Sequence, residues 1–232
     1  MKIYGAGSIE DIKQCLKLGV SGILTNPQGF DQYFQGKMTL EEITKSICDI
    51  TDLPVYIQIH GKDTDELVKR AEKLHKISSQ VGFKIIADKK GFNAIYRLQK
   101  HNIDCIATSL FSLSQAAIAA SVGAFGICPF VSRSLATGID AGAVITAIKK
   151  SYAQLEKAPE IIAVSLKSPL DAEIAIKSGA DAIGMRYPMM EQMMEHPLST
   201  KAELLFAKNW VNVLGEDVSY TSNFSGLKGI AE

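Results

Sequence analysis

The stretch EIIAVSLKSPLDAEIAIKSGADAIGM (160–185) contains one complete unit of the fold. It reads as an apolar strand (160–166), a helical pattern that closes on a glycine (169–179), and a second apolar strand (181–185). Strands that are apolar on both faces and separated by helices are typical of a parallel sheet covered by helices. The glycine between helix and strand fits a helix C-cap in the left-handed conformation.

The same unit recurs along the whole chain. Six further short apolar runs precede this stretch: KIYG (2–5), VSGILT (20–25), PVYIQI (54–59), GFKIIA (82–87), IDCIAT (103–108) and AFGICPF (124–130). KLGVSGI and SVGAFGI repeat the glycine joint of KSGADAIG. Eight such units in 232 residues predict an α/β fold, a (β/α)8 TIM barrel. A doubly wound open sheet is the alternative, but GAGS (5–8) is too short for the glycine-rich phosphate loop expected after its first strand.

No linker or shift in composition marks a domain boundary. We therefore expect one barrel domain over residues 1–215, which includes an extra C-terminal helix over 199–215. That helix carries more apolar side chains than a terminal helix needs, so it either packs on its own barrel or reaches a neighbouring subunit. The polar segment 216–232 is predicted to be a mobile tail.

Composition and charge exclude several classes of function. Lys+Arg and Asp+Glu balance at 25 each and no basic run stands out, which argues against a nucleic-acid partner. No run approaches the length of a membrane span, and the first residues have no apolar core of a signal peptide, so we expect a cytoplasmic protein without a membrane partner. Cys15, Cys48, Cys105 and Cys128 lie far apart without a CxxC pair, which predicts buried thiols and no metal site.

The segment FKIIAD (83–88) places a lysine inside an apolar strand. Alternation puts Lys84 and Asp88 on one face and Phe83 and Ile85 on the other, and the two apolar side chains suit the helix side. Lys84 would then point into the barrel. Burial of an ammonium group costs several kcal/mol and lowers its pKa, and a neutral lysine amine is a nucleophile toward carbonyls. A lysine that reaches solvent or pairs with an acid is the alternative.

Polar residues stand at the predicted carboxyl ends of five other strands, where barrel active sites form. They are Thr25 and Asn26, Gln58 and His60, Thr108 and Ser109, Ser132 and Arg133, and Ser165 and Lys167. Together they predict a polar pocket. Arg133, Ser165 and Lys167 are a candidate cradle for a phosphate monoester, because a guanidinium fork, a hydroxyl and a second cation suit that anion. Surface ion pairing is the alternative for these cations.

Six motifs resemble the transaldolase family, especially its short branch that includes fructose-6-phosphate aldolases. They are GILTNPQG, VYIQI, FKII, IATSLFSLSQA, CPFVSR and AVSLKSP, and the similarity runs from about residue 1 to 215. The resemblance implies a class I aldol mechanism without metal or organic cofactor. It also implies a homo-oligomer, a pentamer or decamer whose rings form through the last helix.

The resemblance also implies a role for each matching residue. Lys84 would form a Schiff base with a ketose phosphate such as fructose 6-phosphate and leave a dihydroxyacetone unit on the enzyme. The other roles fall on strand-end residues: Asn26 and Ser165 for hydroxyls of that unit, Arg133 with Lys167 for the distal phosphate, and Gln58 with Thr108 for a water that transfers protons. Thr25 lies beside Asn26 in the same substrate pocket.

Two positions depart from the family pattern. The first strand ends in Ala6 where the family has an aspartate that takes the C4 hydroxyl proton, and loss of a general base typically costs 10²–10⁴-fold in rate. His60 and Asp88 are the candidate replacements. Phe130 matches true transaldolases and Gln58 does not, so the motifs leave aldol cleavage and transfer to an acceptor sugar both open.

The leading hypothesis is a Schiff-base aldolase or transaldolase that acts on a sugar phosphate. The alternative is a catalytically attenuated family member that binds a sugar phosphate without efficient turnover, motivated by Ala6. A third, weaker possibility is an unrelated phosphosugar barrel such as an isomerase or decarboxylase. Those enzymes need a carboxylate base on an inner strand end, and the inner faces here have few.

Overall fold

The computed structural model describes residues 1–27 and 36–214. Eight parallel strands form a closed barrel in the order β1 to β8, so each strand pairs with its neighbours in the chain and β8 pairs with β1. The strands are β1 (Lys2–Ala6), β2 (Gly22–Leu24), β3 (Val55–Gln58), β4 (Val81–Ile86), β5 (Cys105–Leu110), β6 (Gly126–Pro129), β7 (Glu160–Ala163) and β8 (Ala182–Arg186). The (β/α)8 barrel predicted from the sequence is confirmed.

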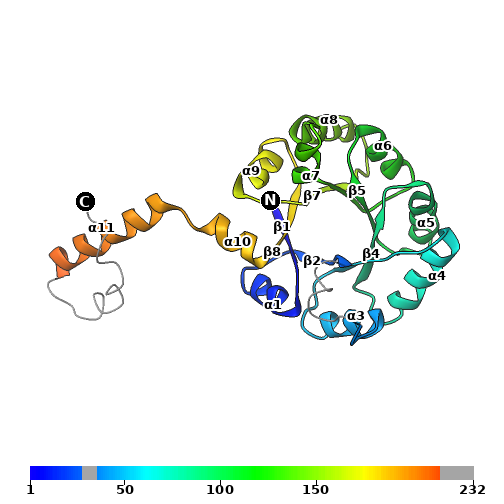
Figure 1. Ribbon diagram of the computed structural model, residues 1–232, viewed down its shortest axis with the longest axis horizontal. Helices are drawn as coiled ribbons and strands as arrows, with labels where there is room; N and C mark the ends of the chain where they lie inside the picture. Colours follow the sequence, from blue (N-terminus) through cyan, green and yellow to red (C-terminus); the bar gives the residue numbers. More distant parts are fainter. Residues whose placement is uncertain (28–35, 215–232) are drawn as a thin grey trace. The chain divides into compact units, whose positions relative to one another are not determined.

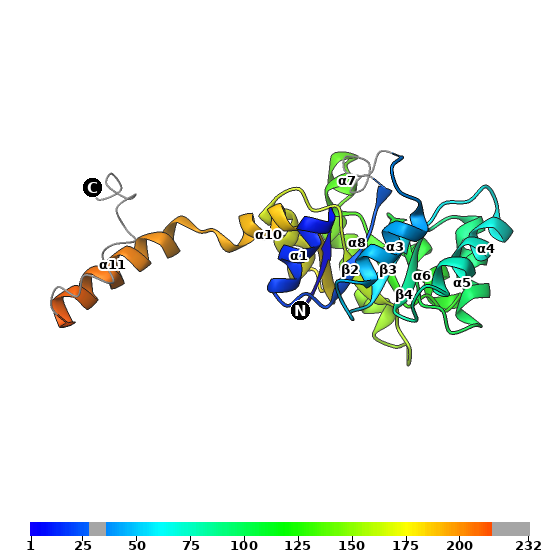
Figure 2. The same ribbon diagram turned by 90° about the horizontal axis from the view of Figure 1, so that it is seen from below.

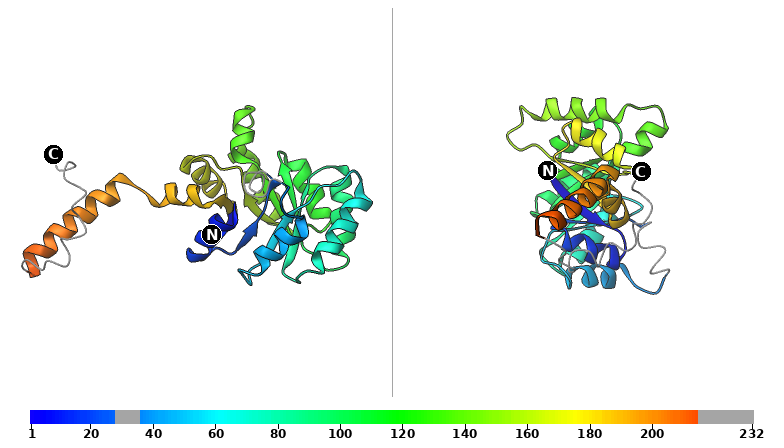
Figure 3. Two further views of the ribbon diagram at one scale, coloured as in Figure 1. Left: turned by 60° about the horizontal axis from the view of Figure 1, so that its bottom comes forward. Right: turned by 90° about the vertical axis from the view of Figure 1, so that its left-hand side faces the viewer.

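Helices surround the sheet in all views of the barrel (Figures 1, 2 and 3). They are α1 (Ile9–Lys17), α3 (Leu40–Cys48), α4 (Thr64–His75), α5 (Lys89–Gln99), α6 (Leu113–Ser121), α7 (Val131–Ala136), α8 (Ala141–Tyr152) and α9 (Pro169–Lys177). Side-chain caps define where many of them begin. Ser8 and Asp11 form a capping box at α1, and Asp88 caps α5 by accepting a hydrogen bond from the Gly91 amide.

The glycine joints behave as the sequence predicts. Gly19, Gly123 and Gly179 follow α1, α6 and α9 with positive φ angles of 70°, 77° and 91°. A side chain is strained in this left-handed conformation, so glycine ends each helix and lets the chain enter the next strand.

Side chains from the inner faces of the strands fill the barrel. This interior cluster contains Tyr4, Leu24, Tyr56, Ile106, Cys128, Ile162, Val164 and Ala182. Glycines make room for its two tyrosine rings: a Cβ added to Gly22 would lie 2.8 Å from Tyr4 Cε1, and one added to Gly82 would lie 2.8 Å from Tyr56 Cε1. The barrel is therefore a packed core rather than a pore.

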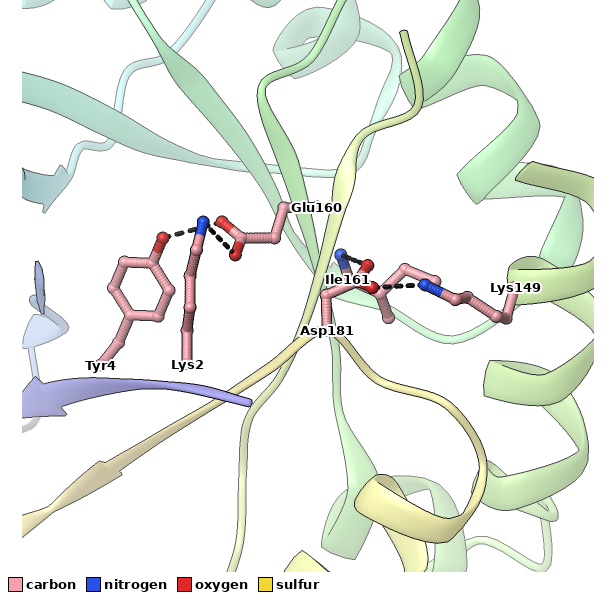
Figure 4. A network of polar contacts seen from close by, with 6 residues as sticks. All are labelled: Lys2, Tyr4, Lys149, Glu160, Ile161 and Asp181. Carbon is pink, nitrogen blue, oxygen red and sulfur yellow. Dashed lines mark hydrogen bonds and ion pairs between the residues drawn. The ribbon is translucent and has the colours of Figure 1, made fainter. Parts of the chain in front are cut away.

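A polar network links the amino ends of β1, β7 and β8 (Figure 4). Tyr4 donates its hydroxyl hydrogen to Glu160 Oε2 at 2.7 Å, and Lys2 Nζ lies 3.0 Å from Glu160 Oε1. Asp181 accepts a hydrogen bond from the Ile161 amide at 3.0 Å and pairs with a lysine of α8. These contacts tie the first strand to the last two at the end of the barrel opposite the predicted site.

Two helices follow the last strand: α10 (Tyr187–Met194) and α11 (Pro197–Leu214). The chain divides into two compact units, residues 1–190 and the segment that begins at Glu191. In α11, Leu205, Phe206, Trp210 and Val213 are exposed. The extra C-terminal helix was predicted correctly, whereas the predicted tail over 216–232 lies outside the described residues.

Candidate active site

Lys84 points into the barrel from β4, as strand alternation predicts. Gly82, two residues earlier on the same face, adjoins the interior ring of Tyr56, whereas Ile85 faces Gly91 in the first turn of α5. Phe83 and Ile85 are fully buried on the helix side of the strand. Lys84 is thus the inner-face residue of β4 that lies beside the interior cluster, on its side toward the carboxyl ends of the strands.

The Lys84 amine is buried among uncharged groups. Its side chain is 5% exposed, and Nζ donates a hydrogen bond to the backbone oxygen of Thr25 at 3.0 Å. Within the described residues no carboxylate lies within ion-pair distance of it. Burial therefore lowers the pKa of Lys84, and the nearby Cys128 thiol opposes this effect only in part.

The ends of β2 and β3 lie against the lysine. Gln58 is the register neighbour of Lys84, and its backbone amide donates to Thr25 Oγ1 at 2.9 Å. Thr25 is 2% exposed. It binds β3 through its hydroxyl, which accepts from Gln58, and β4 through its carbonyl, which accepts from Lys84. Asn26 follows directly and is half-buried. The structure thus brings together four residues that the sequence predicts for the site.

Two buried hydroxyls have no hydrogen-bond partner within the described part of the chain. They are Thr108 Oγ1 on β5 and Ser165 Oγ just after β7. Buried polar groups almost always have a hydrogen-bond partner. Two hydroxyls without one, at the same end of a barrel, are therefore characteristic of a site prepared for a ligand or water. Ser165 also has a positive φ of 60°, a conformation that is uncommon outside glycine and concentrated at functional sites.

Cys128 on β6 completes the surroundings of the lysine. It is the register neighbour of Thr108, whose hydroxyl lies near enough to favour its thiolate form. Burial nevertheless dominates and raises the pKa of Cys128 to about 11, so the thiol stays protonated at neutral pH. The sequence shows Cys128 only as a buried thiol. Its electrostatic interaction with Lys84 depends on strand register, which the sequence does not display.

The predicted anion cradle lies on two neighbouring connections. Arg133 in α7 is exposed, and its guanidinium carbon lies 5.0 Å from the centroid of the Phe130 ring. Phe130 in turn packs edge-on against Phe111, with 5.6 Å between the ring centroids. Lys167 follows β7 and is exposed. Ser132 binds the segment just after β7, since its amide donates to the Ser165 carbonyl at 2.9 Å.

His60 and Asp88 lie at a different place. Both line a small pocket with Lys90 and Gly91, and Lys84 is not among its lining residues. Asp88 is committed to capping α5, and His60 is exposed. Neither residue is therefore assembled with the lysine in this structure, although both belong to the same end of the barrel.

The end of β1 contains the largest departure from the predicted polar rim. Ala6 is buried there, and its register neighbour on β8 is Arg186. Arg186 is missing from the residues predicted for the site, because the sequence pattern places the end of this strand at residue 185. The rule that found the other strand-end residues would have found Arg186 with a boundary one residue later.

A test of Lys84 burial uses the pH dependence of unfolding. The folded state binds the lysine proton more weakly than the unfolded chain, so the charged amine destabilises the fold below the lowered pKa. Stability therefore rises with pH from that lowered pKa toward the ordinary value of 10.5. Each unit of pKa difference corresponds to about 1.4 kcal/mol.

We expect Lys84→Met to be more stable than the natural protein at pH 7, with the difference shrinking toward pH 10. Urea unfolding of both proteins across this range measures it. A stability difference that stays constant over pH 7–10 would contradict a lowered pKa for Lys84.

Other classes of site receive no support from the described residues. Between residues 1–27 and 36–214, no group of three or more His, Cys, Asp or Glu side chains is arranged to hold a metal ion. None of the helices that the structure describes combines the length and apolar character that a membrane crossing requires.

Fold and site together define a TIM-barrel protein whose polar site, around a buried lysine, lies at the carboxyl ends of the strands. Comparison with known families places it more closely. Residues 6–223 match the family Transaldolase/Fructose-6-phosphate aldolase, and the chain belongs to this family. The resemblance inferred from the motifs is confirmed.

Individual relatives agree with this assignment. A "Probable transaldolase" from Dictyoglomus turgidum is 31% identical over 215 residues, which cover 92% of this chain and 99% of the relative. A second, from Dehalococcoides mccartyi, is 33% identical over 218 residues, which cover 92% and 99%. A solved thiamine phosphate pyrophosphorylase from Pyrococcus furiosus shares the fold with a TM-score of 0.55 and 15% identity, covering 79% of this chain and 84% of that chain.

Proposed function

We propose that this protein is a class I aldolase or transaldolase that forms an imine between Lys84 and the ketone of a ketose phosphate such as fructose 6-phosphate. The observation that carries the proposal is the buried amine of Lys84, which contacts a neutral carbonyl and, among residues 1–27 and 36–214, no carboxylate. Burial lowers the pKa of such an amine and so favours its neutral form, which is the nucleophile.

The proposed reaction begins when the neutral Lys84 Nζ attacks C2 of the ketose. Uptake of one proton and loss of water then give a protonated imine. Loss of the C4 hydroxyl proton breaks the C3–C4 bond, whose electron pair moves toward the imine nitrogen and leaves an enamine. An aldehyde is released. The enamine then either takes a proton at C3 or attacks the carbonyl carbon of an acceptor aldehyde, whose oxygen takes a proton. Hydrolysis of the resulting imine releases dihydroxyacetone or the new ketose and frees Lys84. The packed barrel below Lys84 keeps water away from the imine.

Unpaired hydroxyls support the placement of the three-carbon unit. We assign Ser165, together with Asn26, to its hydroxyl groups, since the buried Ser165 Oγ gains a partner when substrate binds. Thr108 and Gln58 would hold a water that carries protons, and this water would also accept the C4 proton, because Ala6 cannot. Arg133 with Lys167 would bind the distal phosphate through charge-assisted hydrogen bonds.

We further propose that the protein acts as a homo-oligomer that forms through its last helix. The exposed apolar side chains of α11 support this proposal, because Phe206 and Trp210 are 61% and 52% exposed. Large apolar side chains grouped on one helix commonly mark an interface.

The mechanism is tested by trapping the imine. The protein is incubated with fructose 6-phosphate or dihydroxyacetone, reduced with borohydride and mapped by mass spectrometry. We expect a reduced carbon unit on Lys84 with both compounds. A three-carbon adduct from fructose 6-phosphate shows that the C3–C4 bond was cleaved despite Ala6.

A six-carbon adduct without the three-carbon one would instead indicate the attenuated protein that binds its substrate without turnover. Unmodified Lys84 with both compounds, or an adduct on another lysine, would contradict the proposed mechanism.

A further inference from the structure

Arg186 begins on the inner face of the barrel, at the rim. It shares its face of β8 with Ala182, which belongs to the interior cluster. A Cβ added to Gly184, between them on the same face, would lie 2.7 Å from the interior side chain of Leu24. Since Arg186 is the last residue of the strand, its side chain starts at the carboxyl end, where barrel sites form.

The guanidinium of Arg186 crosses the end of β1. Arg186 Nη2 and Nε lie 3.0 and 3.4 Å from Asp11 Oδ2 in α1. Ala6 lies beside Arg186 in register, and its single methyl group leaves this path open. A longer side chain at position 6 would compete for the space that the guanidinium takes.

Asp11 holds the guanidinium at a fixed place. Its Oδ2 also accepts a hydrogen bond from the Ser8 amide at 2.9 Å, within the capping box that begins α1. The carboxylate is 12% exposed, whereas the arginine side chain is 40% exposed. An arginine has five N–H donors, and the contact with one oxygen leaves donors on Nη1 and Nη2 for another acceptor.

The position of Arg186 relative to Lys84 indicates which part of a bound substrate this arginine could reach. The closed strand order sets β8 four strands from β4 in either direction, so the two strands face each other across the barrel (Figure 1). A carbon chain attached to Lys84 that extends across the end of the barrel meets the β8–β1 side. A positively charged fork at this side suits a planar or tetrahedral oxyanion.

We propose that Arg186, positioned by Asp11, binds an oxyanion carried by the aldehyde half of the substrate, a phosphate or a carboxylate. This inference rests on the proposed function, because the imine at Lys84 defines which end of the substrate lies farthest from the lysine. Arg186 is then a determinant of specificity for anionic over neutral aldehydes, in addition to Arg133 and Lys167.

The test measures binding of unreactive anions to the whole protein by calorimetry: glycerol 3-phosphate, glycerate and, as the neutral reference, glycerol. We expect Arg186→Met to weaken binding of the preferred anion about 10-fold or more, with Arg186→Lys intermediate. Asp11→Asn is expected to tighten the same binding several-fold, since it removes the negative charge that competes with the anion, while the amide oxygen can still accept from the Ser8 amide and hold the guanidinium in place. The stronger of the two anions identifies phosphate or carboxylate.

Arg97→Met is the matched control, because Arg97 pairs with Asp65 between α5 and α4, on the helical exterior. It should bind anions like the natural protein. The proposal is overturned if Arg186→Met also binds like the natural protein, if Asp11→Asn weakens binding alongside it as a purely structural ion pair would, or if the natural protein binds neither anion.

Turnover separates this proposal from the one it rests on. Dihydroxyacetone carries no anion, so its borohydride adduct on Lys84 should form equally in Arg186→Met. In the same variant, kcat/KM for glyceraldehyde 3-phosphate as acceptor should fall about 10-fold, whereas kcat/KM for glyceraldehyde should stay unchanged. An adduct without anion discrimination refutes the role of Arg186 alone. Anion binding without an adduct refutes the imine mechanism alone.

Discussion

Lys84→Met is expected to abolish both the borohydride adduct and turnover, with a loss in kcat of about 10⁴-fold or more. Methionine fills a similar volume but has no nucleophile, so no imine can form. The fold should survive, because the substitution removes a polar amine whose burial opposes folding. The measurement is the rate of aldehyde release from fructose 6-phosphate, together with mass spectrometry of the reduced protein.

Lys157→Met provides the matched control, since Lys157 is an exposed lysine before β7. It should retain the activity and the adduct of the natural protein. Undiminished turnover in Lys84→Met would show that another residue supplies the nucleophile, or that the reaction does not pass through an imine on this lysine.

Gly91→Ala is expected to destabilise the protein by about 3 kcal/mol. A Cβ at this position would lie 2.0 Å from the backbone oxygen of Ile86 and 3.1 Å from Ile85 Cγ2, so the first turn of α5 or the end of β4 must move. Backbone cannot swing aside as the end of a side chain can. Because Ile86 lies two residues after Lys84, the displacement occurs next to the site. Urea unfolding measures the loss.

Gly142→Ala is the comparison that isolates the backbone clash. Gly142 also lies in the first turn of a helix, α8, but its nearest neighbour for an added Cβ is the side-chain oxygen of Ser178, at 2.9 Å. Removal of glycine from a helix gains roughly 0.5–1 kcal/mol, which offsets this mild contact. Equal stability of the two variants would refute the account given for Gly91.

The sequence predicts this fold well because the signals are local and repeated. The strands are short apolar runs, and helices α1, α3, α4 and α5 are strongly amphipathic. The joints at Gly19, Gly123 and Gly179 need a conformation that glycine supplies without strain. Strand boundaries are less well determined. The pattern places the end of β8 at residue 185 and the end of β5 at residue 108, whereas the strands end at Arg186 and Leu110.

The site is predictable only in part, for physical reasons. Alternation along β4 indicates the inward direction of Lys84, and the strand ends indicate Thr108 and Ser165. Contacts between strands depend on register and on side-chain reach, which no single segment contains. The register that sets Thr108 beside Cys128 and the bond from Lys84 to the Thr25 carbonyl are of this kind.

That last bond has a consequence for how the site can be studied. The group that receives the hydrogen bond of the lysine amine belongs to the main chain, so every amino acid at position 25 still provides it. A saturation scan of side chains at this position would report the hydroxyl bond of Thr25 to Gln58 and miss the bond to the lysine. Chemical synthesis or nonsense suppression that puts a hydroxy acid at position 26 would turn the 25–26 amide into an ester, weaken its carbonyl as an acceptor, and reveal what the bond contributes.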